Sequence, residues 1–405
     1  MKTEYYHSDS FKEDFLKNDK LFLLVLGLFS DDFPMSDRLT VSAKTIGFYV
    51  LNTPLHFLRR LGDAFILWSI ISSTIPLHVW LAILINNYGE VITIRVYHAK
   101  WRRCIYIRVL LKHILGDTLE LQDAAYLKGV SGDNSCCCKC LKRSCNCYLI
   151  REKCERRSTW HRKTLTKPLW DQLLNCSTDN ERIKLIEKFE KETGYTFHHI
   201  IPWEALQLDV YELLAIDVLH VEFTSSGCGK TILKIIIESC STVQYQIIRN
   251  RYKSLLSLDI DRHTKFHAQQ WEKIIRASVL VLKGIIPDKH FYMMVDKVIF
   301  ICLLKCQRMD DTYLELLDKS FFYSRQSQLD NLKPVLMNTP NFHREEELVI
   351  QTYNTGISPC FLECAVGEKM NKECKEPCEF KFSVDYAFTE LVKVRYILKQ
   401  HHTKL

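Results

Sequence analysis

Residues 20–33 read KLFLLVLGLFSDDF, a mostly apolar run that ends in the carboxylates Asp31 and Asp32. A short apolar run closed by acidic residues is typical of a strand buried on both faces of a sheet. Residues 41–51 (VSAKTIGFYVL) and 90–97 (EVITIRVY) are rich in β-branched and aromatic residues, which predicts two further strands. The stretch therefore indicates a sheet with carboxylates where its central strand ends.

The segment 102–115 (RRCIYIRVLLKHIL) carries a second carboxylate, because Gly116 and Asp117 follow it directly. Its apolar spacing fits a strand or a helix, and in either form it would bring Asp117 to the same edge as Asp31. From about residue 230 to 330 the apolar residues recur at helical spacing, and 180–194 (NERIKLIEKFEKETG) is an amphipathic helix closed by glycine. The mixture predicts an α/β protein.

Composition narrows the class of protein. The 405 residues carry 55 Lys and Arg against 48 Asp and Glu, a net charge of +7, and 47% are hydrophobic. These values exclude a disordered chain, a collagen-like chain and a coiled-coil rod. Residues 64–85 are apolar for almost the length of a membrane span, but Pro76 divides them, so we expect a buried strand, turn and helix and no membrane partner. Residues 331–380 are expected to be irregular, before a last helix at 386–400.

The density of cysteine is the most specific feature of the composition. The chain has 17 cysteines and a polar, acidic N-terminus without a secretory signal, so we expect reduced thiols that bind metal rather than form disulfides. Seven lie between Cys136 and Cys154. The pair Cys137 and Cys140 has zinc-knuckle spacing, and three further cysteines or His161 can complete a Zn²⁺ tetrahedron. These three cysteines are Cys145, Cys147 and Cys154.

A basic run accompanies this module. It fits contact with the phosphate backbone of DNA, although a solvated charged face is the alternative interpretation. The candidate DNA-binding residues are Arg151, Lys153, Arg156, Arg157, Arg162 and Lys163.

Three further patterns suggest chemistry. Asp31 and Asp117 at strand ends suit metal-dependent phosphoryl transfer, because hard oxygen ligands hold Mg²⁺. Asp217 and His220 lie one turn apart if their segment is helical, and can meet a phosphate, a metal or simply each other. Residues 224–231 (TSSGCGKT) end in Lys230 and Thr231 like a phosphate-binding loop between a strand-like LHVEF and a helix, but lack its first glycine.

Taken in order, these segments resemble the eukaryotic cut-and-paste DNA transposases of the CACTA type and their relatives. The likeness runs from FSDDFPMSDRL and TIGFYVLNTPLHFLRRL through LGDTLELQDAAYLKGVSGDNSCCCKC to the Asp-x-x-His of Asp217 and His220. It continues with the Trp-containing HAQQWEKIIRASVLVLKGIIP and with FLECAVGEK, which contains Glu363. It spans roughly residues 20–370.

The resemblance implies a ribonuclease-H-like core interrupted by a helical insertion. Asp31, Asp117 and Glu363 would bind Mg²⁺ or Mn²⁺, and Asp217 with His220 would assist strand transfer or hold flanking DNA. The implied reaction is hydrolysis and transesterification of DNA phosphodiesters, in the nucleus, with a homo-oligomer as a further possible partner. Glu368 is an alternative third acid. The His-rich segment of the family is not kept, because Lys333 and Met337 stand where histidines would be, which fits a truncated or domesticated transposase with reduced activity.

The expected organisation follows from these segments. After a tail at 1–19, residues 20–135 form the first part of the core, 136–178 the cysteine-rich basic module, 179–330 the helical insertion and 331–405 a C-terminal segment with the candidate glutamate. Two other functions stay open: a non-catalytic DNA- or protein-binding protein on the same scaffold, and a nucleotide-binding protein that uses Lys230 and Thr231.

Overall fold

The computed structural model divides the chain into two compact units, each described separately below. The sheet unit contains Glu4–Arg143, Glu155–Ala215 and Cys364–Leu405, and the helical unit contains Ile216–Glu363 with Met1–Thr3 and Ser144–Cys154. These boundaries differ from the expected ones, because Glu155–Ala215 packs with the sheet rather than with a separate module or the helical insertion. The residues that the structure describes are 22–34, 42–51, 65–72, 93–98, 101–128, 139–140, 155–197, 202–205, 207–224, 226–306, 310–337, 339–362 and 364.

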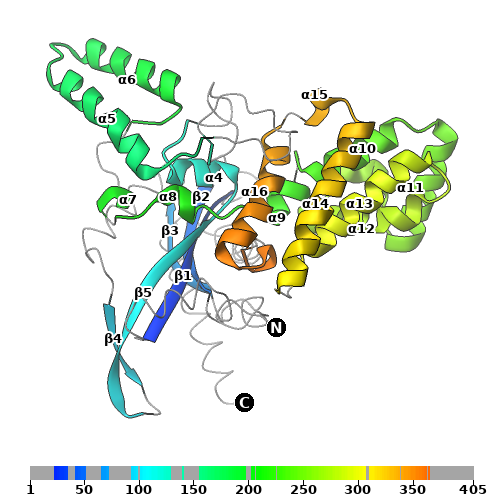
Figure 1. Cartoon of the computed structure of the whole chain (residues 1–405), viewed down its shortest axis with the longest axis horizontal. Helices are drawn as coiled ribbons and strands as arrows, with labels where there is room; N and C mark the ends of the chain where they lie inside the picture. Colours follow the sequence, from blue (N-terminus) through cyan, green and yellow to red (C-terminus); the bar gives the residue numbers. More distant parts are fainter. Residues whose placement is uncertain are drawn as a thin grey trace. The chain divides into compact units, whose positions relative to one another are not determined.

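A five-stranded mixed sheet forms the first unit, in the order β3-β2-β1-β5-β4 (Figure 1). The central strand β1 (Phe22–Pro34) pairs antiparallel with β2 (Ser42–Val50), which pairs antiparallel with β3 (Phe65–Ser72). On its other side β1 pairs in parallel with β5 (Arg103–Leu115), and β4 (Thr93–His98) closes that edge antiparallel to β5. The apolar stretch at 20–30 is thus a central strand, as the sequence predicts, and 102–115 takes the strand alternative.

Helices follow the strands in this unit. The helix α4 (Thr118–Ala124) follows β5 directly, and α5 (Thr159–Leu174) and α6 (Asp179–Thr193) form a hairpin. Two single turns, α7 (Pro202–Ala205) and α8 (Val210–Leu213), complete the unit. The predicted helix at 180–194 is confirmed: Thr178 and Glu181 form a capping box, and Gly194 ends the helix with a φ of 74°.

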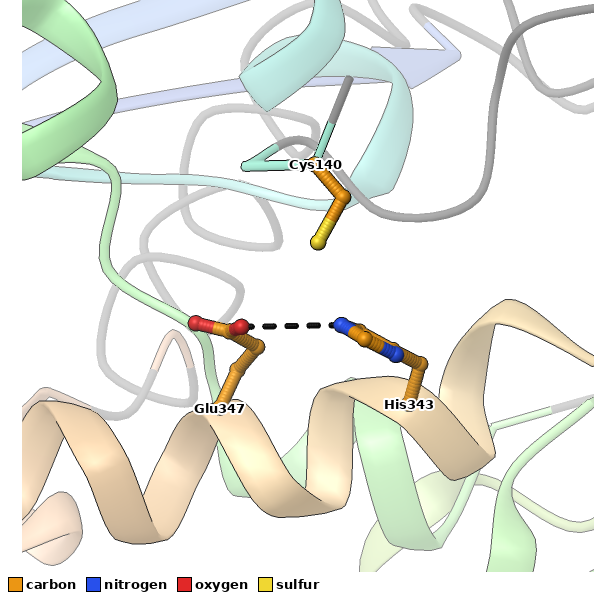
Figure 2. Close-up of side chains that lie close together, drawn as sticks. All are labelled: Cys140, His343 and Glu347. Carbon is orange, nitrogen blue, oxygen red and sulfur yellow. Dashed lines mark ion pairs between the residues drawn. The ribbon is translucent and has the colours of Figure 1, made fainter. Parts of the chain in front are cut away.

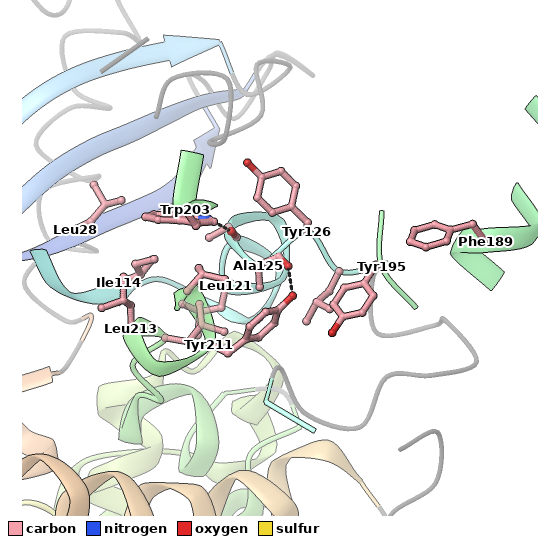
Figure 3. Close-up of a cluster of buried hydrophobic side chains, with 14 of the residues drawn as sticks. Leu28, Ile114, Leu121, Ala125, Tyr126, Phe189, Tyr195, Trp203, Tyr211 and Leu213 are labelled. Carbon is pink, nitrogen blue, oxygen red and sulfur yellow. Dashed lines mark hydrogen bonds between the residues drawn. The ribbon is translucent and has the colours of Figure 1, made fainter. Parts of the chain in front are cut away.

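A cluster of buried aromatic and aliphatic side chains joins β1, β5 and these helices (Figure 3). Leu28 and Ile114 come from the sheet, and Trp203 and Tyr211 from the short helices. The two aromatic side chains also donate hydrogen bonds to the end of α4, from Trp203 Nε1 to the Ala124 carbonyl and from the Tyr211 hydroxyl to the Ala125 carbonyl, both 2.7 Å long. Burial and hydrogen bonding therefore fix α4 against the end of β5.

The helical unit opens with α9 (Val218–Glu222), α10 (Cys228–Glu238) and α11 (Thr242–Leu256). After the 3₁₀ turn η2 (Ile260–Lys265) come its longer helices, α12 (Ala268–Leu282), α13 (Asp288–Leu304) and α14 (Asp311–Asn331). The turn α15 (Pro334–Met337), the helix α16 (Pro340–Thr355) and the turn η3 (Pro359–Leu362) follow. The apolar spacing between 230 and 330 predicts this helical content correctly.

Two expectations about local structure are wrong. The segment LHVEF before the glycine-containing loop is not a strand: it belongs to α9, where Val218, Leu219 and Val221 are buried. The stretch from 331 contains the 16-residue helix α16 rather than irregular structure alone. Among the described helices, none is long and apolar enough to cross a membrane.

Candidate functional site

The ends of β1 and β5 bring acidic residues to one edge of the sheet. The parallel register pairs Phe29 with Leu115, and Asp31 and Asp117 each lie two residues further along. The approach is close, because a Cβ atom at Gly116 would lie 2.8 Å from the Ser30 carbonyl oxygen. Asp117 then caps α4, its Oδ1 accepting a hydrogen bond of 2.9 Å from the Glu120 amide.

The side chain of Asp32 takes part in a cluster of charges at this edge. Asp32 pairs across β1 and β2 with Lys44, whose Nζ lies 3.9 Å from Asp32 Oδ1. The same Nζ lies 2.8 Å and 3.0 Å from the two carboxylate oxygens of Glu120, and 3.9 Å from Asp123 Oδ2. We call Asp32, Lys44, Asp117, Glu120 and Asp123 the acidic cluster. Because side chains alternate along a strand, neighbouring Asp31 is directed to the other face.

The charges of the acidic cluster do not balance. Burial raises the pKa of Asp32 above its usual value, and the carboxylates of Asp117 and Asp123 raise it further against the opposing effect of Lys44. Burial also raises the pKa of Glu120, while the pKa of Lys44 is raised because Glu120 outweighs the opposing effect of burial. Three carboxylates thus lie within 4 Å of one ammonium group, a fourth, that of Asp117, acts on Asp32, and the acids disfavour one another's charge.

This donor set fits a divalent cation. Carboxylate oxygens are the ligands of Mg²⁺ and Mn²⁺, and a bound cation would relieve the repulsion that raises the Asp32 pKa. Glu120 and Lys44 are buried, whereas the side chains of Asp32 and Asp123 keep 48% and 32% of their exposure. The open side of the acidic cluster therefore consists of Asp32 and Asp123, beside the capping Asp117.

Asp217 and His220 form a close pair in the helical unit. Asp217 caps α9 by accepting hydrogen bonds from the amides of Leu219 and His220, and its Oδ2 lies 2.6 Å from His220 Nδ1. Asp217 is buried, and the His220 side chain is 22% exposed. The pairing expected for one helical turn is present, and the hydrogen bond orients the imidazole with its Nε2 directed away from Asp217.

Several candidate residues lie outside the described part of the chain. They are Glu363 and its alternative Glu368, the zinc candidates Cys137, Cys145, Cys147 and Cys154, and the basic residues Arg151 and Lys153.

Cys140 is described, and it is fully buried in the sheet unit. Its residue pairs in an antiparallel bridge with Arg156, and the Arg157 guanidinium donates a hydrogen bond of 2.6 Å to its carbonyl. These contacts join Cys140, within the cysteine-rich stretch, to Arg156 and Arg157, which follow that stretch.

The basic candidates divide by burial. Arg157 and Arg162 are buried, and their guanidinium groups lie 4.8 Å from the ring centres of Tyr195 and Tyr126. Arg162 also donates to the Thr196 carbonyl. They are therefore structural residues and not part of a phosphate-binding surface, which corrects the prediction; Arg156 and Lys163 remain exposed.

In the described part of the loop before Lys230 and Thr231, glycine serves packing and a carboxylate occupies the backbone donor. A Cβ atom at Gly227 would lie 2.4 Å from the carbonyl carbon of Glu222, so this glycine serves close packing against α9. The amide of Gly229 donates to Glu222 Oε2, which places a carboxylate where the N-terminus of α10 would bind an anion. Lys230 Nζ lies 4.7 Å from the ring centre of Trp271. The strand and the anion site that a nucleotide-binding loop requires are thus missing here.

A balanced set of charges lies in the interior of the helical unit. Lys297 Nζ lies 2.8 Å from Glu222 Oε1 and also contacts Glu345, whose Oε2 accepts a bond of 2.8 Å from Arg325. We call Glu222, Lys297, Arg325 and Glu345 the helical-unit network. All four side chains are at most 2% exposed. Each of the two acids thus contacts at least one of the two bases.

Both units contain buried side chains of the kinds that bind transition metals. On α16, His343 Nε2 and Glu347 Oε1 lie 3.5 Å apart on one face of the helix (Figure 2). Cys140, drawn in the same figure, belongs to the sheet unit. Imidazole nitrogen, carboxylate oxygen and thiolate sulfur are all ligands of Zn²⁺. The structure thus supplies possible metal ligands without identifying an ion.

Reasoning from the sequence missed Lys44, Glu120 and Asp123. Two signals could have found them. Lys44 is the only charged residue in the strand VSAKTIGFYVL, and a lone charge in an apolar strand requires a partner. Asp117, Glu120 and Asp123 follow one another at intervals of three, which places them on one face of a helix that begins at Asp117.

Comparisons with known proteins add nothing to this geometry, because no protein-family model and no curated protein matches the chain.

Proposed function

We propose that this chain is a transposase-derived protein whose sheet unit is a ribonuclease-H-like core that cleaves and transfers DNA strands with Mg²⁺ or Mn²⁺. The observation that carries the proposal is the parallel pairing of β1 with β5, because carboxylates follow the last paired residues of both strands at one edge of the sheet. Carboxylates from separate segments at one edge are what a divalent cation in phosphoryl transfer requires.

In this proposal Asp32 and Asp117 hold the cation. Asp32 takes the place first assigned to Asp31, because its charge interacts with that of Asp117 and its side chain is half exposed. Glu363, or Glu368, supplies the third acid that the resemblance implies. When bound, the cation would polarise the scissile phosphodiester and lower the pKa of an attacking water or hydroxyl.

The other residues bind DNA or support the fold. Arg156 and Lys163 are exposed and offer positive charge to phosphates, as do Arg151 and Lys153 in the sequence. The cysteines around Cys140 bind a structural Zn²⁺. Asp217 orients His220 toward DNA that flanks the cleavage site. The protein acts in the nucleus, where such DNA is found.

A second candidate function is favoured by Lys44. Its ammonium group pairs with Glu120 and places a positive charge 3.9 Å from Asp32, beside the position at which a metal-dependent nuclease would bind its cation. A non-catalytic DNA-binding protein that keeps the transposase scaffold would tolerate this lysine.

Plasmid nicking separates the two functions. Supercoiled DNA is incubated with the full chain and Mg²⁺ or Mn²⁺, and the wild type is compared with Asp117→Asn, Asp32→Asn and Asp31→Asn. The exposed Asp171→Asn on α5 serves as the matched control.

We expect Asp117→Asn and Asp32→Asn to lower the nicking rate at least about 100-fold, which is more than the loss of an outer-shell group would cause. Asp31→Asn and Asp171→Asn should nick like the wild type. DNA retardation without any nicking by the wild type would favour the non-catalytic function. Nicking that persists in Asp117→Asn would contradict the assigned site.

A further inference from the structure

Lys44 is buried among carboxylates that come from three elements. Its side chain is 5% exposed and projects from β2. Asp32 belongs to β1, Glu120 and Asp123 belong to α4, and all three place a carboxylate oxygen within 4 Å of the ammonium group. Ser30 supports this arrangement, because its hydroxyl donates a bond of 2.9 Å to Glu120 Oε2.

The contacts of Lys44 are unequal. Both oxygens of Glu120 are within hydrogen-bond distance of Nζ, whereas Asp32 and Asp123 are each 3.9 Å away. A buried carboxylate with a bidentate ammonium partner and a serine donor is satisfied. Glu120 is therefore withdrawn from metal binding, and the negative charge that remains lies with Asp32, Asp117 and Asp123.

We propose that Lys44 is the resident cation of the acidic cluster: it lets the cluster fold without metal and limits how tightly Asp32 and Asp117 bind a divalent cation. This inference rests on the proposed function. A divalent cation beside Asp32 meets the positive charge of Lys44, which lowers its affinity. Removal of that charge frees Glu120 as a further ligand, so the metal can then replace the ammonium group.

The test measures Mn²⁺ binding and stability in the full chain. Free Mn²⁺ is followed by electron paramagnetic resonance during titration of the wild type, Lys44→Met and Lys44→Arg, and thermal unfolding is recorded with and without Mn²⁺. Lys128→Met is the matched control, because Lys128 forms an exposed pair of 3.4 Å with Glu190 in the same unit.

We expect Lys44→Met to bind Mn²⁺ at least about tenfold more tightly than the wild type, because the substitution removes a positive charge beside the bound cation. Its melting temperature should fall without metal and recover with Mn²⁺ by more than the wild type gains. Lys44→Arg and Lys128→Met should bind like the wild type.

Equal or weaker Mn²⁺ binding by Lys44→Met would overturn the inference, as would a loss of stability that Mn²⁺ does not restore. If Lys44→Met folds only when refolded with Mn²⁺, the inference is supported, and if Mn²⁺ does not rescue its folding, the inference is wrong. A wild type that binds Mn²⁺ but nicks no DNA would contradict the proposed nuclease and leave these comparisons unaffected.

Discussion

The two units each gather charged side chains, and they do so in opposite ways. The helical-unit network sets Glu222 and Glu345 against Lys297 and Arg325, all of them almost fully buried. The acidic cluster of the sheet unit contains four carboxylates and the ammonium group of Lys44, and leaves Asp32 and Asp123 partly exposed. Buried acids that each contact a base stabilise the fold, whereas partly exposed acids that outnumber the nearby bases suit the binding of a cation.

The largest effect is expected from Lys297→Met, which breaks the balanced set. The substitution removes the buried ammonium group that both Glu222 and Glu345 contact, so the free energy of unfolding should fall by about 3–5 kcal/mol. Urea denaturation measures the change. The control Lys319→Met removes an exposed pair of 3.6 Å with Glu315 and should cost less than about 0.5 kcal/mol. A loss below about 1 kcal/mol for Lys297→Met would contradict the structural role.

A smaller, pH-dependent effect is expected from Glu222→Gln. Burial raises the pKa of Glu222 to about 8, while Lys297 and Arg325 outweigh burial at Glu345 and lower its pKa to about 2. Folded Glu222 keeps its proton above the pH at which an unfolded glutamate loses it. The stability that it contributes is therefore full below pH 4.5 and is lost as the pH rises through 8.

The slope of stability against pH measures this effect. Unfolding of the wild type between pH 4.5 and 8 releases the proton of Glu222. The unfolding free energy therefore falls by up to about 1.4 kcal/mol per pH unit in this range. Glu222→Gln should flatten the slope, whereas the exposed Glu315→Gln should leave it unchanged. An identical slope in Glu222→Gln and the wild type would show that Glu222 is ionised throughout.

The smallest effect, with the opposite sign, is expected from Asp32→Asn in the unbalanced set. Because the pKa of Asp32 is raised, its charge is unfavourable in the folded protein at neutral pH, and asparagine removes that cost. Without metal the variant should be more stable than the wild type by less than about 1 kcal/mol, since the side chain is half exposed. Thermal unfolding beside the exposed control Asp179→Asn tests this. A clear destabilisation by Asp32→Asn would make Asp32 a structural residue.

Periodicity in the sequence predicts the central strands and most helices, because burial on both faces of β1 and on one face of α6 leaves a clear pattern of apolar residues. Periodicity does not indicate whether Asp31 or Asp32 contributes its side chain to the cation site. The two lie on opposite faces of one strand, and the choice depends on the pairing of Asp32 with Lys44. The segment LHVEF has the composition of a buried strand, which predicts a strand. It forms a buried helical turn instead, because Asp217 caps the start of α9.

The helix α16 could not be predicted for a different reason. Its first half, NFHREEE, has no apolar face, and its charged side chains are nevertheless buried. Glu345 is stabilised there by Lys297 and Arg325, which are distant in the sequence. Thr339 and Pro340 mark its start and Gly356 its end, but tertiary contacts, which the sequence does not show, make its charged first half stable.

Direct Mn²⁺ binding to the wild type, Asp32→Asn and Asp117→Asn tests the central claim, that the ends of β1 and β5 form one divalent-cation site. Electron paramagnetic resonance of the full chain should show a bound ion in the wild type and an affinity at least about tenfold lower in each variant. Equal Mn²⁺ binding by all three proteins, or no binding by the wild type at millimolar Mn²⁺, would contradict it.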